Sequence, residues 1–164
     1  MKIGSETGRR SARMCAVLAG LVLAGCGGSS KPAAPSNLAP VSGTVTVGGK
    51  PVPNVVVTIV PTGTTKGTGG WGKTDDSGTF KVLHQTQAEG VEPGEYMAVF
   101  SLYVKPDGQP LPPNTSPTES RAVQAIPAPW SDPATQSPKQ RFDVPTGGTS
   151  TLAFDLPVPK VKLN

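Results

Sequence analysis

The feature that most constrains the fold is the distribution of glycine and proline along the chain. The sequence has 164 residues, of which 20 are glycine and 19 are proline. Five runs nevertheless contain no proline and a single glycine between them: residues 41–47, 55–60, 79–83, 95–104 and 150–156. Because glycine and proline punctuate regular structure, these runs are where regular elements form. The chain is therefore limited to short elements joined by turns.

The pattern inside these runs predicts β-strands. In residues 41–47 (VSGTVTV) apolar residues or glycine alternate with hydroxyl side chains, which indicates a strand with one buried face. Residues 55–60 (VVVTIV) are almost all β-branched, which is typical of a more buried strand. Residues 95–104 (EYMAVFSLYV) are long enough for a helix, but their β-branched and aromatic content and the preceding Pro-Gly favour a strand.

Further strands are expected at residues 71–74 and around Phe142 and Val144, which share one face. The total is six or seven short strands with no convincing helix, which predicts an all-β, antiparallel β-sandwich. Charged residues make up only 16% of the chain, against a usual value of about 25%, so a coiled coil or a highly charged disordered tail is excluded.

The first 25 residues have the layout of a secretory signal peptide. A positively charged segment precedes the apolar residues 14–24, and this stretch is shorter than the roughly 20 residues that span a bilayer. It ends in Leu-Ala-Gly-Cys, which resembles the bacterial lipoprotein box. That resemblance implies cleavage between Gly25 and Cys26 and lipidation of Cys26. The alternatives are an ordinary signal peptide with an unrelated cysteine and, from Arg9-Arg10, a twin-arginine signal.

Removal of the signal peptide would lower the net charge of the chain. Residues 1–25 hold four of the 15 basic residues and one of the 11 acidic residues, which leaves 11 basic and 10 acidic residues and a net charge of +1. No basic patch then argues for nucleic-acid binding. The mature chain retains one cysteine, Cys26, so no internal disulfide can form.

Residues 26–40 are predicted to be a flexible tether behind the lipid anchor, because they are small, polar and rich in proline. Gly27 stands where an aspartate would retain an enterobacterial lipoprotein in the inner membrane. By that resemblance, the outer membrane is favoured, on its periplasmic or surface face. A folded domain is expected over residues 41–156, followed by a C-terminal tail, 157–164.

Four motifs of this domain carry a family resemblance. They are VSGTVTVGGKPVP (41–53), VVVTIVP (55–61), TDDSGTF (74–80) and PGEYMAVF (93–100). Together they resemble the carboxypeptidase regulatory-like, or transthyretin-like, domain, and residues 126–156 are similar to small bacterial lipoproteins built on it. The resemblance implies a seven-stranded Greek-key β-sandwich that is usually non-catalytic, and some relatives bind carbohydrate.

Two groups of residues suggest chemistry and also have simpler explanations. His84, the only histidine, could act as the base of a hydrolase, but its surroundings (HQTQAEG) predict an exposed loop residue. Asp75 and Asp76 could bind a metal, but Asp-Asp-Ser-Gly is typical of a tight turn. We therefore expect no catalytic residue, no metal and no cofactor.

The most unusual segment is residues 105–140, which is expected to be a long loop and carries 9 of the 19 prolines. It contains Trp130, which could stack on a sugar or anchor a partner, or could fold back and cap the edge of the sandwich. Trp71, between two glycines, has the same alternatives. Ligand binding is therefore assigned to Trp71 and Trp130 only as a hypothesis.

The expected function is that of a non-enzymatic, membrane-anchored lipoprotein, which displays its domain as a structural or interaction module of the cell envelope. Its partners would be the membrane, through Cys26, and an envelope protein or polysaccharide. A carbohydrate-binding module that uses an exposed tryptophan is the alternative, and a hydrolase that depends on His84 is the third hypothesis.

Overall fold

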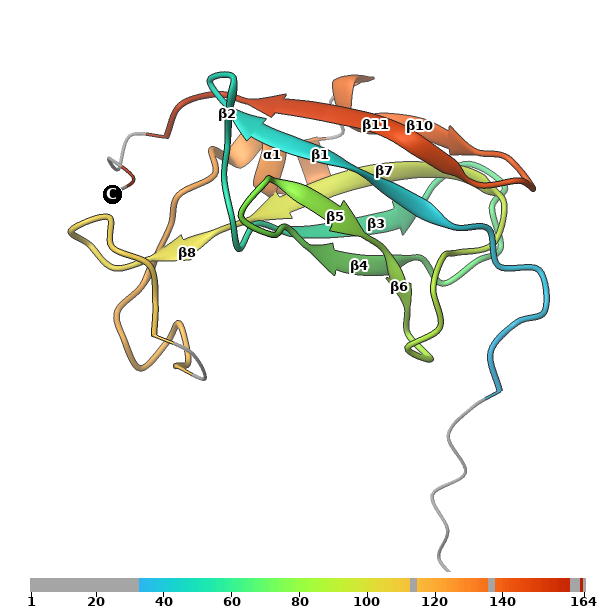
Figure 1. Ribbon diagram of the computed structural model, residues 1–164, viewed down its shortest axis with the longest axis horizontal. Helices are drawn as coiled ribbons and strands as arrows, with labels where there is room; N and C mark the ends of the chain where they lie inside the picture. Colours follow the sequence, from blue (N-terminus) through green and yellow to red (C-terminus); the bar gives the residue numbers. More distant parts are fainter. Residues whose placement is uncertain (1–32, 113–114, 136–137, 160–162, 164) are drawn as a thin grey trace, which may run out of the picture. The chain divides into compact units, whose positions relative to one another are not determined.

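The strands form two main sheets, seen in a computed structural model that describes residues 33–112, 115–135, 138–159 and 163 (Figure 1). The predicted signal peptide, Gly25, Cys26 and the first part of the tether lie outside the described residues. Residues Lys31–Asn164 form one compact unit with its own hydrophobic core. No helix among the described residues is long and apolar enough to cross a membrane.

The first sheet is centred on β1 (Val41–Val47). On one side β1 pairs with β2 (Lys50–Pro51) and β5 (Thr79–Lys81), both antiparallel. On the other side it pairs with β11 (Thr149–Leu156), and this pair is parallel. The β1–β11 pair is therefore an exception to the antiparallel arrangement predicted from the sequence.

The second sheet is antiparallel throughout and has the order β10-β7-β3-β4-β6. In chain order its strands are β3 (Val56–Pro61), β4 (Gly70–Lys73), β6 (Leu83–His84), β7 (Gly94–Ser101) and β10 (Arg141–Val144). The two sheets lie one above the other (Figure 1). An all-β fold is thus confirmed.

The core lies between the two sheets and is closed by aromatic rings from both. Phe100 of β7 contacts Phe154 of β11, with ring centroids 5.0 Å apart, and Phe80 of β5 lies 6.5 Å from Phe154. Phe80 and Phe100 are almost completely buried. The strictly alternating burial along β1, in which Val41, Gly43, Val45 and Val47 point inward, is the one that the sequence pattern predicts.

Two predicted strands are divided in the structure because the chain changes its pairing partner. Residues 79–83 pair with β1 as far as Lys81 and then cross to β4 as β6, with Val82 buried at the crossing. Residues 95–104 follow β7 to Ser101, after which the Leu102 amide donates to the side chain of Gln124. The chain continues as β8 (Tyr103–Val104), which pairs with β9 (Val123–Gln124) in a small third sheet.

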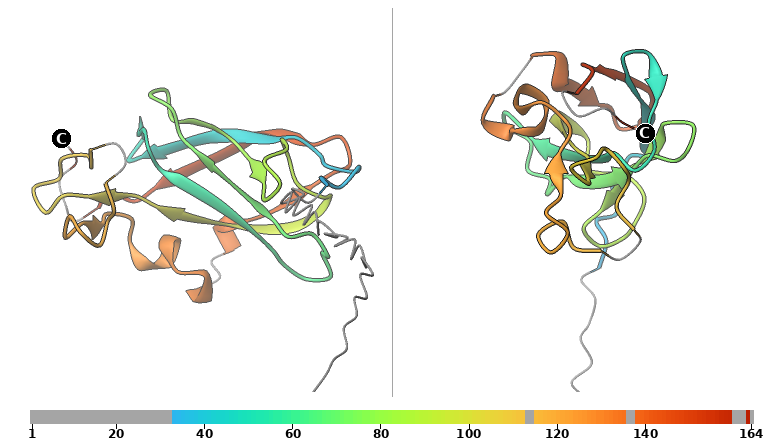
Figure 2. Two further views of the ribbon diagram at one scale, coloured as in Figure 1. Left: turned by 90° about the horizontal axis from the view of Figure 1, so that it is seen from below. Right: turned by 90° about the vertical axis from the view of Figure 1, so that its left-hand side faces the viewer.

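The proline-rich segment 105–140 is more structured than the sequence predicts. Besides β9 it contains one helical turn, α1 (Ala128–Ser131), and 3₁₀ turns at Pro133–Thr135 and Pro138–Gln140. Proline at the start of such turns is favourable, because its fixed φ suits the first helical position. Figure 2 shows α1 and the turns after it beside β7.

Candidate functional site

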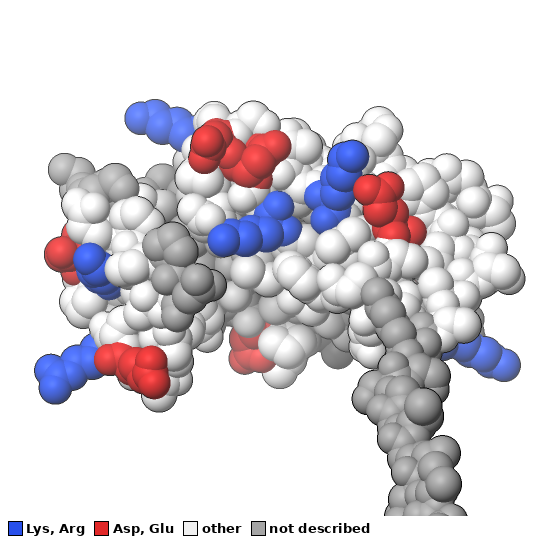
Figure 3. All heavy atoms as spheres, turned by 60° about the horizontal axis from the view of Figure 1, so that its bottom comes forward, with Lys and Arg blue, Asp and Glu red and all other residues white. Residues whose placement is uncertain are grey.

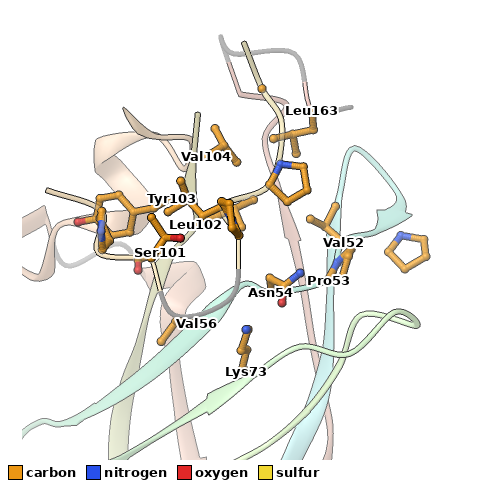
Figure 4. A pocket seen from close by; sticks show the side chains of 17 residues that line it. Val52, Pro53, Asn54, Val56, Lys73, Ser101, Leu102, Tyr103, Val104 and Leu163 are labelled. Atoms are coloured by element: carbon orange, nitrogen blue, oxygen red, sulfur yellow. The ribbon is translucent and has the colours of Figure 1, made fainter. Parts of the chain in front are cut away.

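A pocket of about 710 Å³ lies at the end of the domain where β1 and β7 finish. Three segments supply most of its described lining: the connection from β2 to β3, the end of β7 with β8, and the proline-rich loop after β8. Lys73 of β4 and Leu163 near the C-terminus complete it. The side chains are mainly aliphatic, as Figure 4 shows for Val52, Leu102, Val104 and Leu163. Its volume is within the range of about 300–1,000 Å³ that is usual for sites of small ligands.

The floor of the pocket is held by a buried threonine. Thr74, only 4% exposed, donates its hydroxyl to the carbonyl of Val52 (2.7 Å) and accepts from the amide of Val55 (2.9 Å). Between them, Asn54 has a positive φ of 66° and donates its backbone N–H to the carbonyl of Thr74 (3.0 Å). A positive φ is uncommon for a residue other than glycine, although asparagine tolerates it best. The turn that presents Asn54 to the pocket is therefore fixed by hydrogen bonds.

Another wall of the pocket is formed by the start of the proline-rich loop, where backbone hydrogen bonds form a turn. The amide of Gly108 donates to the carbonyl of Lys105 (2.8 Å), and the amide of Lys105 donates to the carbonyl of Gln109 (2.9 Å). Pro110 then forms a bridge with Val104 of β8. These contacts place the next residue, Leu111, on the pocket wall. The composition of this loop was noted in the sequence, but its partner across the pocket is about 50 residues away along the chain, so the pocket itself was missed.

Residues 33–40, the described part of the predicted tether, lie at the other end of the domain. Ala39 pairs with Val91, and the carbonyl of Pro40 accepts from Thr149, the first residue of β11. β1 begins at Val41, directly after these contacts, and runs to the pocket end at Val47. Figure 1 shows the two ends of β1 on opposite sides of the domain, with β8 and its loop beyond the far end.

Trp71 is exposed on the outer face of the second sheet. Its side chain is 41% exposed, and it lies on β4 between Thr58 of β3 and Leu83 of β6 in register. Lys73, two residues on, shares the same face and lines the pocket. Figure 3, a view from the side of β4 and β6, shows positive and negative residues scattered among uncharged ones on this surface, with no patch of a single sign.

Trp130 is half-buried and packs against the core. Its ring lies 5.9 Å from that of Phe100, and its carbonyl accepts from the side-chain amide of Gln140 (3.1 Å). Gln140, 1% exposed, also donates to the carbonyl of Ala98 (2.9 Å). Gln140, the residue before β10, thus satisfies a backbone carbonyl of β7 next to the first pair of the β10–β7 ladder. This packing favours the capping alternative for Trp130.

His84 is buried, with 4% of its surface exposed, so the prediction of an exposed loop residue is wrong. The strand continues past Leu83 and pairs His84 with Gly70, on the inward side of β4. The Nε2 atom lies 2.8 Å from the hydroxyl of Thr68, and Nδ1 lies 2.9 Å from that of Thr86. Both ring nitrogens are therefore engaged by threonine hydroxyls from two neighbouring loops.

Next to His84 lie two further polar groups that sequence reasoning missed. A carboxylate oxygen of Glu92 is 3.8 Å from Nε2 of His84, and the hydroxyl of Tyr96 donates to the carbonyl of Glu92 (2.6 Å). Burial, and secondarily the charge of Glu92, raise the pKa of Tyr96 to about 12. His84 therefore links the loops at 62–69 and 85–93, and Tyr96 holds the second of these loops to β7.

Asp75 takes part in a turn, as the sequence predicts. Its carboxylate accepts from the hydroxyl of Ser77 (2.6 Å) and from the amides of Ser77 and Thr79 (both 2.9 Å), and Gly78 has a φ of 74°. These hydrogen bonds, led by that of the Ser77 hydroxyl, lower the pKa of Asp75 below its ordinary value. The local donors account for the carboxylate.

Comparison with protein-family models, with curated proteins and with solved structures gives no match to this chain. The function of the protein is therefore inferred from the geometry of the chain itself.

Proposed function

We propose that the protein is a non-enzymatic lipoprotein of the bacterial cell envelope, anchored by a lipid on Cys26. In this proposal its domain is a transthyretin-like, seven-stranded Greek-key β-sandwich that serves as a binding module. Export by the signal peptide 1–25 and retention at the outer membrane complete the proposal.

The observation that carries the proposal is the placement of tether and pocket at opposite ends of the domain. Residues 33–40 leave beside the start of β1, and the pocket lies where β1 ends. A domain held at the first end presents the second end away from the membrane. A protein whose task is to meet a partner or ligand from an anchored position benefits from this arrangement.

The lipid anchor is tested by growth with labelled palmitate. The wild-type chain is expected to incorporate the label, and Cys26→Ser is expected to lose it, because the thiol is the atom that carries the lipid. Label retained in Cys26→Ser would refute the anchor.

The binding role is tested by crosslinking in cells, followed by purification. Leu111→Asp places a charge on the apolar wall of the pocket, and Thr146→Asp places the same charge in the exposed turn at the tether end. Both changes lie in loops, so the core is preserved. Crosslinked partners should be lost with Leu111→Asp and kept with Thr146→Asp. Equal recovery from both variants would contradict a role for the pocket.

A carbohydrate-binding module is the second candidate, and the exposure of Trp71 on a sheet surface favours it. An indole on such a surface is suited to stacking on a sugar ring. Affinity electrophoresis in envelope polysaccharides should show retardation of the wild type and none for Trp71→Ala. Equal mobility of the two proteins in every polysaccharide would exclude this candidate.

A further inference from the structure

Among the described residues that line the end pocket, Lys73 is the one with a charged side chain. This lysine lies on the outer face of β4, opposite Val56 of β3. Within the part of the chain that the structure describes, it forms no ion pair with a carboxylate. The apolar pocket therefore carries a positive charge at one place and no negative charge among its lining residues.

One polar side chain of the lining, that of Asn54, lies beside this lysine. Figure 4 shows the amine of Lys73 directed towards the side chain of Asn54, with Val104 and Leu163 on the far side of the pocket. Asn54 is held there by its fixed backbone, with its N–H donated to the carbonyl of Thr74. An ammonium group and an amide, both hydrogen-bond donors, thus meet at one end of the pocket.

Apart from Ser101, Tyr103 and Thr115, the remaining side chains of the described lining are aliphatic or proline and suit an apolar body. Val52, Leu102, Leu111 and Leu163 supply branched side chains, and Tyr103 is 44% exposed at the rim. One ammonium and one amide match an anion of a single charge. A phosphate group would call for a fork of arginines or a cluster of backbone N–H groups, and the lining residues that the structure describes include no arginine.

We propose that this pocket binds an aliphatic monocarboxylate, with the carboxylate at Lys73 and Asn54 and the alkyl chain against the aliphatic walls. The inference deepens the proposed function, because it names the ligand class of the same pocket. It does not depend on the lipid on Cys26.

The expected contribution of Lys73 follows from its setting. Lys73 is an exposed residue that lines an apolar site, so water screens its pairing with a carboxylate in part. A hydrogen bond to a charged group in such a position changes a dissociation constant by about tenfold. The apolar contacts are made equally by a neutral chain of the same length.

The test is a calorimetric titration of the domain Lys31–Asn164, which has its own core, with decanoate and with 1-decanol. The wild type should bind decanoate more tightly than decanol. Lys73→Met should weaken decanoate binding about tenfold and leave decanol binding unchanged. Lys81→Met, which removes an exposed lysine of β5 outside the lining, is the matched control and should change neither.

A variant of the apolar wall and a set of contrary results complete the test. Leu111→Asp should weaken both ligands, because it charges the aliphatic wall. Absence of decanoate binding, equal affinity for decanoate and decanol, or an equal effect of Lys73→Met and Lys81→Met would overturn the inference. Pocket-dependent crosslinking in cells, with no binding of decanoate, would leave the proposed function standing and refute only this ligand class.

Discussion

Replacement of Gly43 by alanine is expected to separate β1 from β11 and destabilise the domain. Gly43 pairs with Leu152 in the parallel ladder. A Cβ atom added at Gly43 would lie 2.3 Å from the carbonyl oxygen of Leu152 and 2.7 Å from its Cβ. Ordinary van der Waals contact begins at 3.4 Å, so one strand must move by about 1 Å. The backbone of β11, rather than a flexible side chain, is in the way.

The magnitude follows from two opposing terms. Forcing extra atoms into a packed site costs about 1–3 kcal/mol. Alanine in a strand recovers about 0.5–1 kcal/mol relative to glycine, because the unfolded chain has less freedom to lose. The net expectation is a loss of about 1–2 kcal/mol from a free energy of unfolding that is about 5–15 kcal/mol for a domain of this kind.

The assay is urea unfolding of the domain, followed by tryptophan fluorescence, with Gly147→Ala as the control. Gly147 lies in the turn before β11, and an added Cβ there meets no atom within 4 Å. Gly147→Ala should therefore leave the midpoint unchanged or raise it slightly, whereas Gly43→Ala should lower it. If the two variants unfold at the same urea concentration, β1 and β11 do not approach each other as closely as the parallel pairing requires.

Three further changes test the core and the ionisable groups. Phe100→Ala should lower the free energy of unfolding by about 3–5 kcal/mol, because the ring is fully buried against other aromatic rings. If denaturant titration shows that the free energy of unfolding falls by less than about 1 kcal/mol, this packing is contradicted. The pKa of Tyr96 is raised to about 12, so the contribution of this tyrosine to stability is complete below pH 10.0 and is lost as the pH rises towards 12. Ultraviolet titration of the wild type should therefore show a tyrosine that ionises near pH 12, and Tyr96→Phe should remove this phase. A phase that persists in the variant would assign the raised pKa to another group. Hydrogen bonds, first from the backbone N–H of Gly49, lower the pKa of Asp155 below 3.8, so its contribution is present above pH 3.8 and is lost as the pH falls through the lowered value. Asp155→Asn should flatten the acid limb of stability against pH, and an unaltered limb would contradict this role.

Local sequence is enough to predict most strands but not their partners. The alternation in residues 41–47 gives β1 with its bounds, because burial of one face leaves a period of two. The breaks at Val82 and Leu102 are hidden, because the apolar pattern continues while the chain passes from one sheet to another. The parallel pairing of β1 with β11 joins residues more than 100 positions apart, and nothing local encodes it.

The site was predicted less well, for a similar reason. Trp71 and Trp130 attract attention by residue type, whereas the pocket is assembled mainly from aliphatic and proline residues that are far apart in the sequence. The dipeptide Pro53-Asn54 before a β-branched run is the one local sign of a fixed turn there. His84 was misplaced because its pairing with Gly70, rather than its polar neighbours in sequence, determines its burial.

The central claim is that the pocket end of the anchored domain is the end that meets its partner, and photo-crosslinking in living cells tests it most directly. A photoreactive amino acid would replace Tyr103, which is 44% exposed at the pocket rim, and in a second strain Thr146, which is exposed in the turn at the tether end. The account predicts adducts from position 103 and none from position 146. Adducts from position 146 alone, or equal adducts from both, would contradict it.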